Sequence, residues 1–181
     1  KNGNATRLND TLMAVYEDYP EEAFYALMNL MGSHDVARAI YILGGGSDSS
    51  ERAEFGNYDE DLGKQRLKLA ALFEFGYAGA PTIYYGDEAG VTGSKDPDCR
   101  RSYPWGNEDT SLISFYEAIG TIRQENKDLF SHGDLTTLYT GSEGVYVYGR
   151  SYEDDHAIVA INPTNTDAKV TVDLKEFTGN G

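Results

Sequence analysis

The chain has 181 residues, of which 40% are hydrophobic and 25% charged, a globular composition long enough for one domain or one and a half. Thirty acidic residues against 15 basic ones give a formal net charge of −15, which excludes nucleic acid and anionic membranes as favoured partners and suits a neutral ligand such as a sugar. The single cysteine, Cys99, excludes an intrachain disulfide, and no apolar run approaches the roughly 20 residues of a membrane span.

The beginning of the chain predicts two helices followed by a buried strand. Apolar residues recur at helical spacing over residues 8–19 and predict an amphipathic helix. Pro20 ends this helix and can open a second, short one, whose first turn suits the acidic Glu21 and Glu22. Residues 27–33 are apolar on both faces at their centre, which is typical of a parallel strand buried between helices.

The middle of the chain predicts three further elements after a polar loop over roughly residues 44–63. The elements are a helix over residues 64–78, a compact β-branched and aromatic strand over 82–85, and a helix over 112–122. Thr110 or Ser111 is the expected N-cap of the helix over 112–122.

Closely spaced strands with turn residues between them then predict an antiparallel β domain. These strands cover residues 135–139, 145–148, 157–161 and 170–174. We place the domain boundary between residues 1–131 and residues 132–181. Two buried parallel strands cannot close a barrel, which takes eight. The first part is therefore either a small open α/β unit or the tail of a barrel whose other strands lie upstream.

Both ends of the sequence resemble cuts inside a longer protein. The chain begins at Lys1 with neither an initiator methionine nor a signal-peptide apolar region, and it stops directly after a strand pattern. Localisation therefore stays open, with an extracellular location slightly favoured over a cytoplasmic one.

Two predicted strands end in polar clusters, which is where barrels and open α/β sheets bind ligands. The first strand leads into Ser33, His34 and Asp35, and the second into Asp87 and Glu88. Ser-His-Asp in consecutive positions is not a catalytic triad, because the three side chains would point in different directions along an extended segment. On spacing alone, a His-Asp pair that merely caps the next helix is the favoured interpretation.

Three segments, in their order and spacing, resemble glycoside hydrolase family 13, the α-amylase family. Residues 29–35 are similar to the segment at the seventh barrel strand, which ends in His-Asp, and residues 81–88 resemble the eighth strand. Residues 96–101 resemble the Asp-Pro-x-x-Arg loop that follows it. The residues of these segments, particularly 28–38 and 95–105, resemble most the neopullulanase, cyclomaltodextrinase and amylopullulanase branch of the family. The resemblance implies the carboxy-terminal part of a (β/α)8 barrel followed by a truncated antiparallel β-sandwich domain.

The resemblance also implies roles for five residues. Asp35 matches the third carboxylate of the family, which holds the distorted sugar as oxocarbenium character builds, and His34 matches the neighbouring hydrogen-bond donor. Asp96 and Arg100 match loop residues that bind glucose units towards the non-reducing end, since a carboxylate and a fork-shaped donor suit paired hydroxyls. Arg38 fits an adjoining substrate-binding position.

Two essential groups of the family are missing from the sequence. Retaining glycosidases need a nucleophilic carboxylate and an acid/base carboxylate, and the segments that carry them in this family do not occur in residues 1–181. The resemblance places both upstream, together with most of the calcium ligands. We therefore expect no cofactor or metal in this piece, calcium only in the full-length protein, and no glycosidase activity from the chain alone.

The leading hypothesis is an enzyme that cleaves α-1,4 links in starch, pullulan or maltodextrins with retention, with α-1,6 links as further substrates. A non-catalytic glucan-binding or interaction protein with an amylase-like barrel is the alternative from another class, and a 4-α-glucanotransferase is a third. The expected partner is an α-glucan, with no nucleic acid and no membrane. Because flanking strands are missing, we also expect self-association or rearrangement at exposed strand edges.

Trp105, the single tryptophan of the chain, follows Pro104. It could stack on a sugar, but packing is the favoured interpretation of a lone tryptophan beside a proline. We therefore expect no site role for it.

Overall fold

The computed structural model describes residues 4–47 and 57–179. They form two compact units, each built from segments that are distant in the sequence. The described parts of Lys1–Met28, Gly76–Ala80 and Arg123–Gly181 make the first unit, and those of Asn29–Phe75 and Pro81–Ile122 make the second. Part of the polar loop predicted at 44–63 lies outside the described residues.

The first unit begins with the two expected helices, α1 (Ala5–Asp18) and α2 (Glu21–Tyr25). The side chain of Asn4 caps α1 by accepting a hydrogen bond from the backbone N–H of Arg7 at 2.9 Å. Pro20 stands at the N-cap of α2, as predicted. No described helix is long and apolar enough to cross a membrane.

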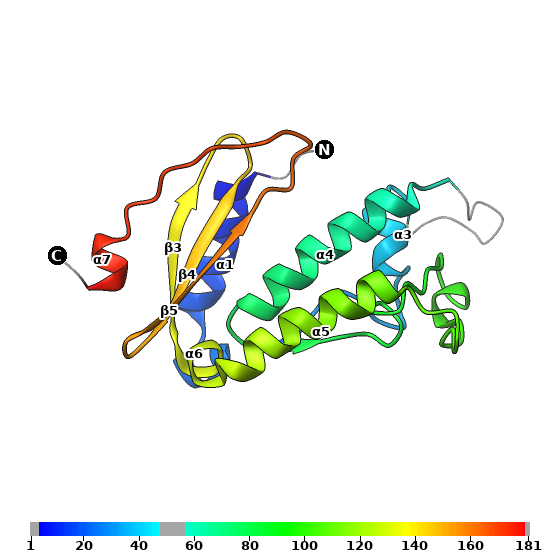
Figure 1. Ribbon diagram of the computed structural model, residues 1–181, viewed down its shortest axis with the longest axis horizontal. Helices are drawn as coiled ribbons and strands as arrows, with labels where there is room; N and C mark the ends of the chain where they lie inside the picture. The colour runs from blue at the N-terminus through cyan, green and yellow to red at the C-terminus, as the bar shows by residue number, and fades with distance from the viewer. Residues whose placement is uncertain (1–3, 48–56, 180–181) are drawn as a thin grey trace. The chain divides into compact units, whose positions relative to one another are not determined.

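An antiparallel sheet in the order β3–β4–β5 follows the short helix α6 (Lys127–His132) in the same unit (Figure 1). Its strands are β3 (Asp134–Thr140), β4 (Tyr146–Tyr152) and β5 (Asp155–Ile161). The central strand β4 is the most buried, since residues from Tyr146 to Arg150 are all shielded from solvent. Three of the four predicted strands are thereby confirmed.

The prediction of a fourth strand, over residues 170–174, is wrong. Figure 1 shows this segment as an extended coil that pairs with no strand among the described residues. It leads instead into a helical turn, α7 (Lys175–Thr178), whose Phe177 lies where a side chain of Gly149 would be. The Phe177 ring also packs edge-on against His156 of β5, with centroids 5.2 Å apart. Anchoring of α7 on the sheet thus directs the segment away from strand pairing.

Two arginines bind backbone carbonyl groups around the segment 76–80 of the first unit. Arg150 donates to the carbonyl oxygens of Gly76 at 3.1 Å, Phe130 at 3.1 Å and Gly133 at 2.7 Å. Arg123 donates to the Gly79 carbonyl at 2.6 Å. Gly76 is the last residue of α4 (Glu60–Gly76) and Gly133 follows α6, so one buried cation serves the negative ends of two helices.

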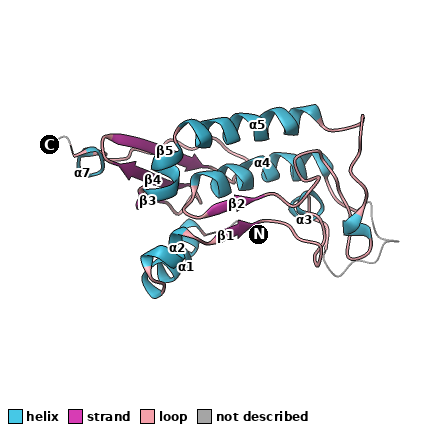
Figure 2. Ribbon diagram, turned by 90° about the horizontal axis from the view of Figure 1, so that it is seen from below, coloured by secondary structure: helices cyan, strands magenta, loops and turns pink. Residues whose placement is uncertain are grey.

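The second unit contains the two long helices α4 and α5 (Thr110–Glu125), which run side by side in Figures 1 and 2. Ala71 of α4 packs with Tyr116 and Ile119 of α5 in one apolar cluster. A second cluster joins Leu67 and Leu112 to the short helix α3 (Ala39–Leu43), which the sequence analysis did not predict.

Both long helices begin earlier than predicted because aspartates cap them. Asp59 accepts a hydrogen bond from the Leu62 backbone N–H at 3.0 Å, so α4 starts at Glu60 rather than at residue 64. Asp109 accepts from the Leu112 N–H at 3.1 Å, which corrects the predicted cap at Thr110 or Ser111.

The two short strands β1 (Met28–Leu30) and β2 (Ala80–Thr82) pair with each other (Figure 2). The prediction that β1 is buried on both faces is wrong for this chain, since Met28 is 64% exposed and no other described strand joins β1 and β2. The predicted strand at 82–85 is also shifted, because the carbonyl of Tyr85 accepts a hydrogen bond from a side chain, Arg38, instead of from a strand.

Candidate functional site

Four of the five predicted site residues lie together in the second unit, around the guanidinium group of Arg100. Its Nε lies 2.8 Å from an Asp96 carboxylate oxygen and donates to the backbone carbonyl of His34 at 3.1 Å. Its Nη2 lies 3.9 Å from Oδ1 of Asp35, and the ring Nε2 of His34 lies 3.2 Å from the same oxygen. The structure therefore joins the strand-end pair His34–Asp35 to the Asp96–Arg100 loop.

The functional groups of this cluster face solvent. The side chains of His34 and Asp35 are 63% and 71% exposed, and those of Arg100 and Asp96 are about half exposed. Capping of a following helix by Asp35, the alternative left open by spacing, has no support in the described contacts, since the next helix, α3, has Arg38 at its N-cap without a side-chain cap. Exposed carboxylates beside an exposed guanidinium can bind a polar, uncharged ligand from solvent.

The loop that carries Asp96 and Arg100 is fixed from beneath by Asp98. The buried Asp98 carboxylate accepts hydrogen bonds from the backbone N–H of Ser94 at 2.9 Å and from Arg101 at 2.8 Å. Although burial acts to raise it, these bonds hold the pKa of Asp98 below its ordinary value. Asp98 therefore stays ionised and connects Ser94, before the 3₁₀ turn Asp98–Arg100, to Arg101, directly after it.

Arg38 occupies a different position from the other four predicted residues. Its side chain is fully buried and lies over the rings of Tyr84 and Tyr85, at 4.1 and 4.5 Å from their centroids. It donates to the carbonyl of Cys99 at 2.6 Å and to that of Tyr85 at 2.5 Å. A guanidinium without exposed surface supports the site from below, by connecting the segment after β2 to the Asp96–Arg100 loop.

Asp87 is the buried carboxylate partner of Arg38, at 3.3 Å. Burial raises the pKa of Asp87 to about 6, while the positive charge of Arg38 opposes that rise. Gly32 faces the same carboxylate, and a side chain at position 32 would come within 2.7 Å of it. The sequence analysis noted Asp87 as part of the strand-end cluster but gave it no role.

Glu74, near the end of α4, is a second buried carboxyl that the sequence analysis missed. It accepts a hydrogen bond from the backbone N–H of Thr82, the last residue of β2, at 2.9 Å. Burial raises the pKa of Glu74 to about 7, and the nearby Asp87 contributes in the same direction. Its position among apolar residues in the helix 64–78 was the one available signal, since Phe73 and Phe75 flank it.

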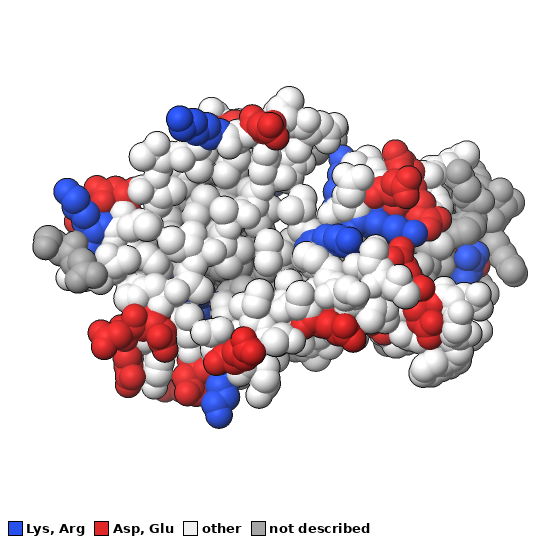
Figure 3. Space-filling view, in the orientation of Figure 1, with Lys and Arg blue, Asp and Glu red and all other residues white. Residues whose placement is uncertain are grey.

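Lysine and arginine side chains gather over α4, with acidic groups beside them (Figure 3). Lys64 of α4 lies 2.8 Å from Glu60 and 3.0 Å from Asp109, the cap of α5. The hydrogen bond with Glu60, followed by that with Asp109, raises the pKa of Lys64 to about 12. These ion pairs connect the starts of the two helices and leave the exposed cluster around Arg100 apart from them.

No three histidine, cysteine or acidic side chains come together as a metal site within residues 4–47 and 57–179.

Two family models match the chain: the α-amylase catalytic domain over residues 3–146 and the α-amylase C-terminal domain over residues 133–181. The chain belongs to the α-amylase family. The predicted resemblance to glycoside hydrolase family 13 is thereby confirmed. Because the two matches overlap over residues 133–146, the domain boundary placed at 131/132 stays a prediction.

Several α-amylase family members are similar over nearly the whole chain. An amylopullulanase of Thermoanaerobacterium saccharolyticum is 44% identical over 98% of this chain, and a cyclomaltodextrinase of Thermoanaerobacter pseudethanolicus is 32% identical over 97%. The chain spans only 14% and 27% of these two relatives. The solved structure of a debranching enzyme from Nostoc punctiforme matches with a TM-score of 0.79 and 30% identity, over 96% of this chain and 32% of that one.

These matches establish the fold class. The first part is the end of an α-amylase catalytic (β/α)8 barrel, and the antiparallel sheet β3–β4–β5 belongs to the C-terminal β domain that follows it. The exposed apolar side chains on β1 follow from this assignment, since a closed barrel places further strands beside each of its strands.

Proposed function

We propose that the protein containing this chain is a glycosidase that hydrolyses α-1,4 glucosidic bonds in starch, pullulan or maltodextrins with retention, and α-1,6 bonds as well. One observation carries the proposal: the exposed cluster of His34, Asp35, Asp96 and Arg100 in a chain of the α-amylase family. Relatives named amylopullulanase, cyclomaltodextrinase and neopullulanase support an α-glucan as the substrate.

Asp35 is the group that acts in the transition state. As the glycosidic bond breaks, positive charge develops on the sugar ring, and a fixed carboxylate near it lowers the barrier. Its neighbours His34, at 3.2 Å, and Arg100, at 3.9 Å, hold the carboxylate and leave most of it exposed to a ligand. His34 then donates to a hydroxyl of the same sugar.

Asp96 and Arg100 bind glucose units further along the substrate. Their ion pair, at 2.8 Å, presents one acceptor and one multiple donor side by side, which matches neighbouring hydroxyl groups of a sugar. These contacts exist before and during the reaction alike, so they serve binding more than turnover.

The nucleophile and the acid/base come from the part of the protein outside this chain. Retaining glycosidases place these two carboxyl groups roughly 5–5.5 Å apart, and no segment of the 181 residues carries the family pattern for either. The chain alone should therefore release no reducing sugar from soluble starch above a buffer blank. Measurable release would overturn this part of the proposal.

Asp35→Asn in the full-length enzyme tests the role of Asp35. The change keeps the shape but removes the charge, so kcat on a maltodextrin should fall by about 10²-fold or more while KM changes little. Arg100→Ala should instead raise KM for long maltodextrins more than it lowers kcat. Near-normal turnover in the Asp35→Asn enzyme would reduce the His34–Asp35 pair to a structural feature.

A further inference from the structure

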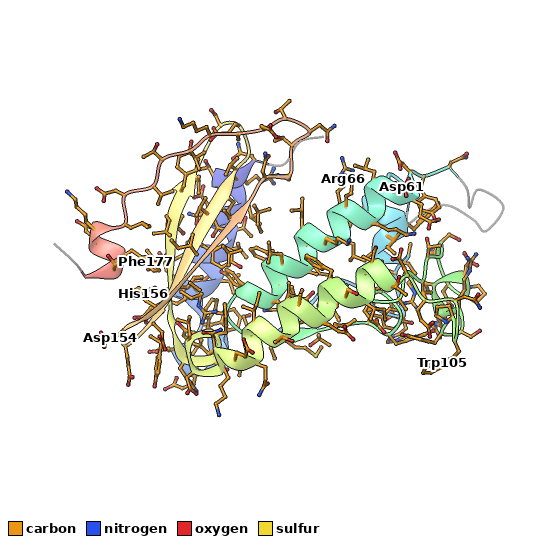
Figure 4. The ribbon with its side chains drawn as sticks, in the orientation of Figure 1. Asp61, Arg66, Trp105, Asp154, His156 and Phe177 are labelled. Carbon is orange, nitrogen blue, oxygen red and sulfur yellow. The ribbon has the colours of Figure 1, made fainter. Side chains whose placement is uncertain are left out.

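Trp105 is the most exposed large apolar side chain of the described residues. The expectation that packing buries it is wrong, because it is 80% exposed. Figure 4 shows its side chain at the outer end of the loop before α5, pointing away from the helices. Keeping an indole ring in water forgoes the favourable burial of a large apolar surface, so its exposure needs an explanation.

Backbone hydrogen bonds hold Trp105 in this position. The Trp105 N–H donates to the Tyr103 carbonyl at 3.0 Å, and the Asn107 N–H donates to the Pro104 carbonyl at 2.7 Å. Gly106 between them has a φ of +79°, a backbone conformation that residues other than glycine adopt only with steric strain. The tip of the loop is therefore a formed turn that presents the indole ring in a set orientation.

Tyr103 extends the aromatic surface of Trp105. The two rings have centroids 4.5 Å apart and planes inclined by 46°, so the exposed indole continues into the half-buried ring of Tyr103. Partial burial and the carboxylates of Glu88 and Glu108 raise the pKa of Tyr103, which places both acidic groups near its ring. Glu108 itself is held by the Gly106 N–H at 3.1 Å.

The two aromatic rings and the neighbouring carboxylates of Glu88 and Glu108 indicate the chemical class of the ligand. A glucose unit offers an apolar C–H face that stacks on an aromatic ring and hydroxyl groups at its edge that donate to carboxylates. Anionic ligands are disfavoured, because Glu88 and Glu108 would repel them and the chain carries a net charge of −15. A neutral oligosaccharide fits both the rings and the acidic rim.

We infer that Tyr103 and Trp105 form a stacking platform for the same α-glucan chain that Asp96 and Arg100 bind. Trp105 lies five positions after Arg100, which limits the distance between their Cα atoms to about 18 Å or less. A maltooligosaccharide held at Arg100 can therefore extend to the platform. The inference rests on the proposed function and adds to it a contact that matters for long substrates.

The test uses the full-length enzyme with Asp35→Asn, in which turnover is slow enough to measure binding. Isothermal titration calorimetry with maltoheptaose should give a Kd about ten-fold higher after Trp105→Ala, and at most about two-fold higher after Trp105→Phe. Tyr19→Ala, which removes another exposed aromatic ring, should leave the Kd unchanged. Trp105 is mostly exposed, so its loss should not lower the melting temperature.

The outcomes separate the two proposals. Failure of the enzyme with native Trp105 to bind maltoheptaose would sink the proposed function and the platform with it. An unchanged Kd after Trp105→Ala would contradict the stacking platform and leave the proposed function standing. The same result is expected if the rest of the protein covers the Trp105 ring.

The single tryptophan allows a second measurement on the 181-residue chain. Its fluorescence should change saturably with maltoheptaose and not with a β-linked cellooligosaccharide. An unresponsive tryptophan in a chain that circular dichroism shows to be folded would also count against the platform.

Discussion

The buried carboxyl groups of Glu74 and Asp87 make the stability of the second unit depend on pH. Both have pKa values raised by burial, to about 7 and about 6. A raised pKa means that folding favours the protonated form, so the stabilisation is complete below the ordinary pKa near 4 and is lost as pH rises through 6 to 7. The ion pair with Arg38 limits this loss at Asp87 and leaves Glu74 as the larger contributor.

Glu74→Gln should remove most of this pH dependence, because the amide oxygen can still accept from Thr82 without becoming charged. Between pH 4 and pH 8 the native chain should lose roughly 3 kcal/mol more unfolding free energy than the variant, because burial raises the pKa of Glu74 to about 7. Urea denaturation at several pH values measures this. Glu117→Gln, at an exposed position on α5, is the control, and equal pH profiles for Glu74→Gln and the native chain would contradict the assignment.

At the level of elements, Arg150 is the connection between β4 and two helix ends. Its three hydrogen bonds go to carbonyl groups at or just beyond the ends of α4 and α6, which have no partner within their helices. Arg150→Met should lower the unfolding free energy by about 2–4 kcal/mol, since it removes the guanidinium donors to the Gly76 and Gly133 carbonyls and leaves Phe130 with only its 3.4 Å contact to Arg123. Thermal unfolding measures the loss.

Arg150→Lys should rescue little of this stability, because one ammonium group cannot reach three carbonyls in the geometry of the guanidinium fork. Arg7→Met, at an exposed position of α1, removes the same charge and should change stability by less than about 0.5 kcal/mol. A melting temperature equal to that of the native chain would show that water replaces the arginine without cost.

The elements also show where sequence patterns stop being informative. Helical periodicity predicted α1, α4 and α5, but it missed the caps that set their starts, which are Asn4, Asp59 and Asp109. The alternation at 170–174 resembles a strand whether or not a neighbour is present to pair with it. Likewise, spacing alone favoured a helix cap at His34 and Asp35, and only the resemblance to the family predicted His34, Asp35, Asp96 and Arg100 as site residues. The burial of Arg38 and Glu74 depends on contacts between segments distant in sequence, which no local pattern shows.

At the scale of the whole molecule, the exposed apolar side chains on and after β1 and β2 are the main liability of the isolated chain. Met28, Leu30, Met31 and Ile83 are each at least 40% exposed beside a two-stranded sheet with open edges. The 181-residue chain should therefore self-associate at micromolar concentration, because such edges pair with further strands.

Size-exclusion chromatography with light scattering measures this association. A mass of 19.9 kDa at every concentration would contradict it. Lysine substitutions at Met28 and Ile83 should shift the distribution towards the monomer, whereas Ile122→Lys, on an exposed face of α5, should leave it unchanged.

The support that Arg38 gives to the site has an evolutionary consequence. Two of its hydrogen bonds end on main-chain oxygens, those of Tyr85 and Cys99, which every amino acid supplies. Substitution at position 99 therefore leaves the support intact, provided that the new side chain fits a fully buried space. Position 38 has no such freedom, because only arginine combines a planar fork with packing against two aromatic rings, those of Tyr84 and Tyr85. Among diverging copies of this domain, position 99 can therefore change its side chain while the arginine beneath the loop stays fixed.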